Sequence, residues 1–162
     1  MTATVTLNGR RYRYRREDGP GLVDAALQYL EELCVRDGDV IADPAAVRDY
    51  LRLRLLPRKR EVFAVMFLDT RHRLIEYREL FKGTINGASV HPREVARVAL
   101  EVNAAAVILA HNHPSGDPTP SSPDVRITLR LKFALDLVGV RVLDHIVVGF
   151  EGIASMAEQG AI

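Results

Sequence analysis

Two short, continuous apolar runs constrain the fold of this chain more than any other feature. They are VFAVMFLD at residues 62–69 and AAVILA at residues 105–110. A run of this length, bounded by polar or turn-forming residues, is typical of a buried β-strand. We therefore expect both runs to form buried strands of one sheet.

Strand-like and helical patterns alternate around these two runs. LIEYRELFKG (74–83) and VRVLDHIVVGF (140–150) predict two further strands. We expect helices over residues 92–104 and 124–138, each beginning at or just after a proline that suits a first helical turn. Strands that alternate with helices predict an α/β fold, in which a mixed β-sheet is flanked by helices.

The N-terminal third predicts a hairpin and two more helices. TVTLNGRRYRYR (4–15) has a strand-like alternation on both sides of Asn8-Gly9, which suits a type I′ turn. After the Gly19-Pro20-Gly21 break, helical spacing extends over residues 22–35, and Asp43-Pro44 opens a helix that ends near Leu56.

The hairpin leaves two interpretations open. Tyr12 and Tyr14 would lie on one face, opposite arginines that alternate with them. Arginines interleaved with aromatic residues could bind nucleic acid through charge and stacking, and Arg11, Arg13 and Arg15 are the candidates. The alternative is a solvated arginine face opposite a half-buried tyrosine face.

Composition limits the class of protein. A chain of 162 residues with 48% hydrophobic and 27% charged residues is long enough for one sizeable core. Cys34 is the only cysteine, so an intramolecular disulfide and a four-cysteine zinc site are both excluded. No signal peptide or membrane-spanning run is evident, and we expect a cytoplasmic protein without a membrane partner.

The stretch HNHPSGDPTPSSPD, residues 111–124, follows the second apolar run directly. Because strand side chains return to the same face every second residue, His111 and His113 would point the same way. Asp124 would lie in the first turn of the next helix, where the helix dipole favours a carboxylate. A histidine pair at a strand end can also be mere surface, and Asp124 an ordinary helix-start residue. Taken together, the three predict a metal site.

Two histidines and one carboxylate point to a catalytic zinc site. They leave a fourth tetrahedral position for water, whose pKa zinc lowers from 15.7 to about 7. Such a site also needs a hydrogen-bond donor for the developing oxyanion. Ser121 is our candidate for that donor, and Ser115 is a weaker one.

These residues make the sequence resemble a known family. The spacing His111-x-His113, seven residues, Ser121, two residues, Asp124 is similar to the JAMM motif of MPN-type zinc metallopeptidases. HNHPSGDPTPS, with PREVARVALEVNAAAVILA before it and LDHIVVG after it, resembles the bacterial RadC family within that group. The resemblance begins at about Ile41, so we expect an extension at 1–40 and a zinc hydrolase domain at 41–162.

The chain departs from the family pattern at two points. Asn112 stands where deubiquitinating members carry a small hydroxyl residue. A predicted hairpin and helix over residues 1–38 replace the helix-hairpin-helix region of full-length RadC proteins.

The resemblance implies a three-layer, cytidine-deaminase-like fold with zinc on the three residues named above. It also implies a glutamate on an earlier strand as the general acid and base. Glu61, which precedes VFAVMFLD, fits that context better than Glu76 or Glu79. For His145, in LDHIVVG, we expect a role behind a metal ligand or in the core, because a third histidine would close the open position.

The function that follows is a zinc-dependent metallopeptidase or isopeptidase, acting on a protein or peptide through a zinc-bound water and Glu61 as base. The rival is a DNA-repair-associated accessory protein whose metal site is structural or vestigial, with the hairpin arginines as the contact. Nucleobase deamination is disfavoured because the chain lacks a Pro-Cys-x-x-Cys segment. The apolar faces of the N-terminal helices could also serve a homodimer.

Overall fold

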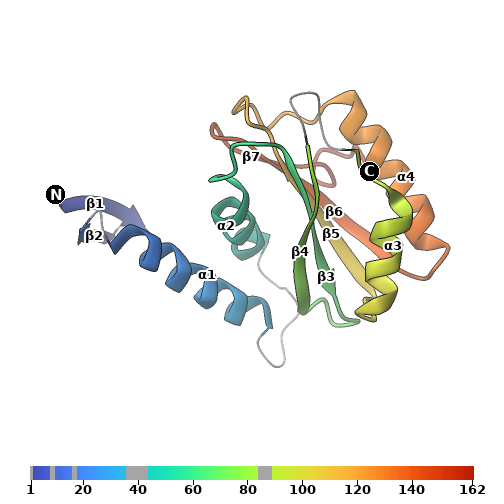
Figure 1. Ribbon diagram of the computed structural model, residues 1–162, viewed down its shortest axis with the longest axis horizontal. Coiled ribbons are helices and arrows are strands. Elements are labelled where there is room, and N and C mark those ends of the chain that lie inside the picture. Colours follow the sequence, from blue (N-terminus) through green and yellow to red (C-terminus); the bar gives the residue numbers. More distant parts are fainter. Residues whose placement is uncertain (1, 8–9, 16–17, 36–43, 84–88) are drawn as a thin grey trace.

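The computed structural model describes the backbone of residues 2–7, 10–15, 18–35, 44–83 and 89–162. Side chains are described for residues 18–31, 44–83 and 89–162. The main body is a five-stranded mixed sheet with helices on both faces (Figure 1), which confirms the predicted α/β class.

The sheet has the strand order β4-β3-β5-β6-β7. The pairs β3–β4, β3–β5 and β6–β7 are antiparallel, and β5–β6 is parallel. The two apolar runs therefore become adjacent strands near the centre of the sheet, as expected. The strands are β3 (Val62–Leu68), β4 (Leu74–Lys82), β5 (Ala106–Asn112), β6 (Arg141–Val148) and β7 (Ile153–Ser155).

Alternate residues of β3 and β5 belong to two different cores. Ala64, Met66 and Leu68 pack with α2 (Pro44–Leu55) on one face of the sheet. On the other face, Phe63, Val65 and Phe67 pack with side chains from α3 (Pro92–Glu101) and α4 (Ser122–Asp136), which Figure 1 shows side by side. Both strands are buried on both faces, which explains why their sequences are apolar without alternation.

The N-terminal elements are β1 (Thr2–Leu7), β2 (Arg10–Arg15) and α1 (Gly19–Val35). The two strands pair antiparallel, which confirms the predicted hairpin, and Figure 1 shows them at the far end of α1 from the main sheet. The Asn8-Gly9 turn, and the side chains of Arg11, Arg13 and Arg15, lie outside what the structure describes.

Helix α1 is joined to α2 by polar contacts. Tyr50 of α2 donates a hydrogen bond of 2.9 Å to Glu31 of α1, and Arg54 pairs with the same carboxylate. None of the helices in the described part of the chain is long and apolar enough to cross a membrane.

Four boundaries differ from those predicted. Helix α1 begins at Gly19, so the glycine-proline segment forms its first turn, where proline needs no hydrogen-bond donor. Helix α3 ends at Glu101 rather than near residue 104, because Asn103 adopts a positive φ of 55°. Helix α4 begins at Ser122, with Ser121 as its cap, rather than at residue 124, and β5 continues through Asn112 rather than ending at residue 110. The three-residue strand β7 was not predicted.

The turn between β6 and β7 lies against the loop that follows β5. A Cβ atom added to Gly149 would stand 2.1 Å from the carbonyl oxygen of Gly116, which accepts a hydrogen bond of 3.0 Å from the Glu151 amide. Real Cβ atoms do not approach a backbone oxygen so closely, so only glycine fits here. This contact supports the loop that carries His113 on one side and Asp117 on the other.

Gly149→Ala is expected to lower the free energy of unfolding by about 1–3 kcal/mol, because the new methyl group must displace the 113–118 loop. Gly152→Ala is the matched control, since its Cβ would meet only Pro118 at 3.7 Å, an ordinary contact. Urea unfolding of both variants beside the parent measures the difference. Equal stability of the two variants would contradict the close approach.

Candidate metal centre

Strand β5 directs two imidazoles to the face of the sheet that α4 covers. His111 lies within the strand, two residues after Leu109, which belongs to the core on that side. His113 is one residue beyond the strand, but its amide donates 2.9 Å to the Val148 carbonyl and so keeps the chain along β6. The alternation therefore persists, and both histidines point the same way, as predicted.

The start of α4 fixes the carboxylate of Asp124. Ser121 is the N-cap, and its hydroxyl accepts a hydrogen bond of 3.3 Å from the Asp124 amide. In return, Asp124 Oδ2 accepts bonds from the Ser121 amide (2.6 Å) and the Ser121 hydroxyl (2.5 Å). This capping box immobilises the carboxylate, with Oδ1 turned to His111 and Oδ2 turned to His113.

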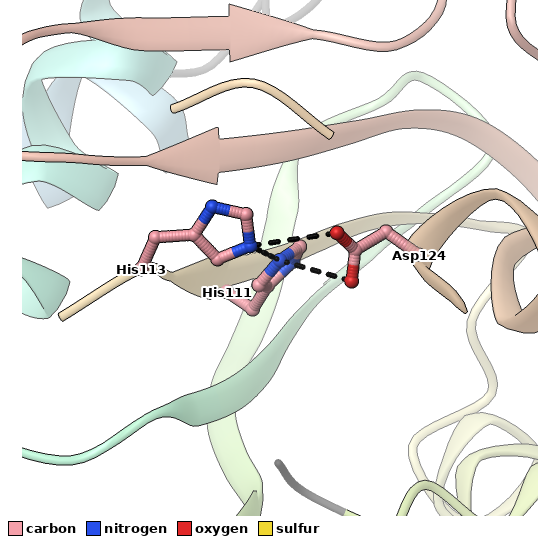
Figure 2. Close-up of side chains that lie close together, drawn as sticks. All are labelled: His111, His113 and Asp124. Atoms are coloured by element: carbon pink, nitrogen blue, oxygen red, sulfur yellow. Dashed lines mark hydrogen bonds and ion pairs between the residues drawn. The ribbon is translucent and has the colours of Figure 1, made fainter. Parts of the chain in front are cut away.

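The three side chains converge on one point (Figure 2). The two Nε2 atoms are 2.9 Å apart, His111 Nε2 is 3.3 Å from Asp124 Oδ1, and His113 Nε2 is 3.4 Å from Oδ2. One ligand atom from each residue lies within 4.8 Å of the others, a spacing that a single metal ion could bridge. His111 is buried, but His113 and Asp124 remain 18% and 13% exposed, so the point of convergence can be reached from solvent.

The partners of the other ring nitrogens show which atoms are free for a metal. His113 Nδ1 lies 2.8 Å from the Asp117 carbonyl oxygen, so it carries a hydrogen and donates. His111 Nδ1 lies 2.8 Å from His145 Nε2. Two Nε2 lone pairs facing each other at 2.9 Å, beside a carboxylate, need a proton or a cation between them. The donor set of two imidazole nitrogens and one carboxylate oxygen therefore fits a divalent transition metal.

Two buried polar residues, His145 and Thr128, support His111 on the side away from the point of convergence. His145 is fully buried, and burial, with the nearby His111, lowers its pKa so that it stays neutral. Its Nδ1 lies 2.6 Å from the Thr128 hydroxyl, which donates 2.5 Å to the Asp124 carbonyl. The Thr128 hydroxyl already uses its hydrogen on the Asp124 carbonyl, so it accepts a hydrogen bond from His145 Nδ1. Neutral His145 then has no hydrogen on Nε2, which accepts a hydrogen bond from His111 Nδ1. The relay holds the His111 tautomer that frees Nε2.

The relay also places His145 where the sequence suggested, behind a ligand rather than in the ligand cluster. The sequence analysis did not identify Thr128, because a threonine on the buried face of a helix has no distinctive local pattern.

The ring of Phe63 packs against both histidines on the buried side of the site. Its centroid is 6.4 Å from that of His111 and 5.4 Å from that of His145.

The charges of the cluster depend on one another. Although burial opposes ionisation, hydrogen bonds from His111 and His113 hold the pKa of Asp124 far below its ordinary value. The pKa of His113 is raised, mainly by its hydrogen bond with Asp124 and further by the Asp117 carbonyl and the charge of Glu61. The cluster is thus already organised to hold positive charge.

Glu61 precedes β3 on the same side of the sheet as the cluster. The antiparallel register pairs Phe63, which packs on the α4 side of the sheet, with His111, and Glu61 lies two residues before Phe63. The effect of the Glu61 charge on His113 agrees with that placement. By contrast, Glu76 and Glu79 lie on β4 and form ion pairs with arginines. Ser115 is exposed in the loop after His113.

A small hollow of about 160 Å³ adjoins His113. Its walls are apolar at Leu56, Val148 and Phe150, and two basic residues, Arg58 and Lys59, complete its lining with Asn112 and Pro114. A volume of this size holds about one amino-acid side chain.

These features define the class: a mixed α/β domain of the JAB/MPN fold with a candidate metal site at the end of a central strand. A family model described as RadC-like JAB domain matches residues 41–161, and this chain belongs to that family. The resemblance to RadC proteins stated from the sequence is therefore confirmed.

Relatives show the same family at high identity. A UPF0758 protein of Vibrio cholerae serotype O1 is 53% identical over 154 residues, which cover 95% of this chain and 92% of the relative. UPF0758 proteins of Cellvibrio japonicus and Marinobacter nauticus are 61% and 59% identical over 123 and 141 residues. This chain covers 55% and 63% of their lengths. Their name states no activity.

Metal uptake is expected to weaken as the pH falls. The raised pKa of His113 means that a proton occupies the cluster below that value, and a metal must displace it. The apparent association constant for Zn²⁺ should fall by about tenfold per pH unit below this pKa and level off above it. Chelator competition between pH 5.5 and 8.5 measures the profile. An affinity that does not change with pH would contradict it.

Thr128→Val is expected to lower the Zn²⁺ affinity by about 10–100-fold, because His145 loses its acceptor and no longer holds the His111 tautomer. Thr128→Ser keeps the hydroxyl and is the matched control, with affinity close to that of the parent. Unfolding of both metal-free variants separates loss of stability from loss of affinity. Equal affinities in stable Val and Ser variants would show that the relay does not tune His111.

Proposed function

We propose that this protein is a zinc-dependent hydrolase that cleaves peptide or isopeptide bonds. The observation that carries the proposal is the convergence of His111 Nε2, His113 Nε2 and Asp124 at a point that solvent can reach. Glu61 is near enough for its charge to raise the pKa of His113. Three protein ligands and an accessible vacancy are typical of catalytic zinc sites, whereas structural zinc sites have four protein ligands.

Zinc at this site would supply a Lewis acid that polarises the scissile carbonyl and lowers the pKa of the attacking water. The protein residues divide the remaining work. Glu61 takes the proton from the water and later delivers it to the leaving amine. His111 and His113 are held in the tautomer that presents Nε2 to the metal, and the capping box holds Asp124.

Ser121 is our proposed donor to the oxyanion. Its hydroxyl hydrogen is directed at Asp124 Oδ2, 2.5 Å away, so donation to the substrate requires rotation about the Cβ–Oγ bond. The hydroxyl of Ser121 therefore has two roles in this proposal: it orients the carboxylate and stabilises developing charge.

The hollow that His113 borders lies mainly on the α2 side of the sheet, with Leu56 and Val148, so it would hold a substrate side chain next to the metal point rather than at it. Its apolar walls suit the stem of one side chain, and Arg58 and Lys59 favour a substrate with a negative group at that position. Arg58 already pairs with Glu79, so Lys59 provides the larger share of free positive charge.

Glu61→Gln is expected to retain one zinc per chain and to lower the hydrolysis rate by a factor on the order of 10²–10⁴, because the amide cannot accept the proton. Glu76→Gln, which removes a carboxylate from β4, should hydrolyse at nearly the parent's rate. Metal analysis and steady-state kinetics on an isopeptide-linked substrate make the comparison. A Glu61→Gln variant that retains the parent's rate would exclude Glu61 as the base, and zinc retained by His113→Ala would exclude the ligand set.

A further inference from the structure

Asn112 stands between the two histidines, yet its side chain lies on the opposite face of the sheet. It is 3% exposed, and it is directed away from α4, so it cannot reach a metal held by its neighbours. A buried amide must find hydrogen-bond partners or destabilise the fold, so its contacts identify its role.

The Asn112 amide makes a complete set of bonds to one segment. Its Oδ1 accepts a hydrogen bond of 2.8 Å from the Val62 amide. Its Nδ2 donates to the carbonyl oxygens of Arg60 at 3.0 Å and Arg58 at 3.3 Å. Val62 and Arg60 are the residues on either side of Glu61.

This arrangement extends the β3–β5 ladder beyond its last backbone pair. The register pairs Phe63 with His111, so Asn112 stands opposite Val62, where the backbone of β5 turns to bond with β6 through His113. The carboxamide of Asn112 has one donor group and one acceptor, like a peptide group, and it bonds the β3 chain in place of the missing backbone. A serine hydroxyl is shorter and could not reach both Val62 and Arg60.

Glu61 is thereby held from two sides. On the β4 side, its own carbonyl oxygen accepts a hydrogen bond of 2.7 Å from the Gly83 amide. On the β5 side, Asn112 bonds the residue before it and the residue after it. The segment is fixed to the strand that carries both histidines, so the position of Glu61 is set relative to them.

We propose that Asn112 is a positioning residue, which clamps the backbone on both sides of Glu61 and so sets the distance between the general base and the metal. The inference rests on the proposed function, in which Glu61 transfers the proton. The proposal explains the asparagine at position 112, where the peptidase pattern has a small hydroxyl residue. From the sheet face opposite the metal ligands, Asn112 helps to align Glu61 for the reaction.

Two substitutions test the clamp. Asn112→Ser replaces the two-ended amide by one short hydroxyl, which cannot accept from Val62 and donate to Arg60 at once. The Val62 amide should therefore exchange its hydrogen faster, as measured by NMR on the metal-free protein. Asn112→Asp is close to isosteric and keeps an acceptor for Val62, but it places an oxygen against the Arg60 carbonyl. It provides the measurement if Asn112→Ser does not fold. Both variants should bind zinc as the parent does, because the ligands are unchanged.

The kinetic signature distinguishes positioning from general support. Asn112→Ser should lower kcat by about 10–100-fold with little change in KM, since misplacing a catalytic group by about 1 Å has an effect of this order. In the Glu61→Gln background, the same substitution should have almost no further effect, because the group that it positions is already inactive.

Other outcomes overturn the proposal. An equal loss of rate in both backgrounds would mean that Asn112 acts independently of Glu61, and unchanged exchange at Val62 would mean that no clamp exists. A zinc-loaded parent that cleaves no peptide or isopeptide substrate contradicts the proposed function instead. In that case, hydrogen exchange at the Val62 amide tests the clamp by itself. If this amide is equally protected in the parent and in Asn112→Ser, the clamp proposal is overturned.

Discussion

The candidate site depends on the burial of β5 between two neighbouring strands. Backbone hydrogen bonds to β3 and β6 hold the strand along both edges, and apolar side chains cover both of its faces. A strand fixed in this way cannot rotate or slip, because a shift of one residue would move every side chain into the opposite core and break the hydrogen bonds to both neighbours. His111 and Asn112 at its end are therefore aimed at opposite faces. One face receives the metal ligands, and the other receives the clamp on the Glu61 segment.

Charge is then concentrated at a single point of this rigid frame. Two imidazole nitrogens 2.9 Å apart, beside an ionised carboxylate, form a cluster that is stable only with a proton or a cation at its centre. The relay through His145 and Thr128 returns to the backbone of Asp124, so the histidine and the aspartate are tied into one network. Such a preorganised cluster needs little rearrangement on binding a metal.

The sequence predicted most of the fold and the three converging residues, and the reasons are local. Continuous apolar runs marked β3 and β5, a two-residue repeat aligned His111 with His113, and the start of a helix located Asp124. Element ends were less predictable. The strand β5 extended into the histidine pair because the His113 amide bonds to β6. Helix α3 stopped early because Asn103 adopts a left-handed conformation, which local spacing does not predict.

By itself, the sequence determined the period of each element, the family resemblance and the set of residues able to hold a metal, since these depend on neighbours a few positions apart. Only the tertiary structure decided what surrounds them. His145 meets His111 from 34 residues away, and Asn112 reaches Val62 across 50 residues. Contacts of this kind follow from strand order and register, which the packing of the whole core selects and which no short stretch of sequence encodes.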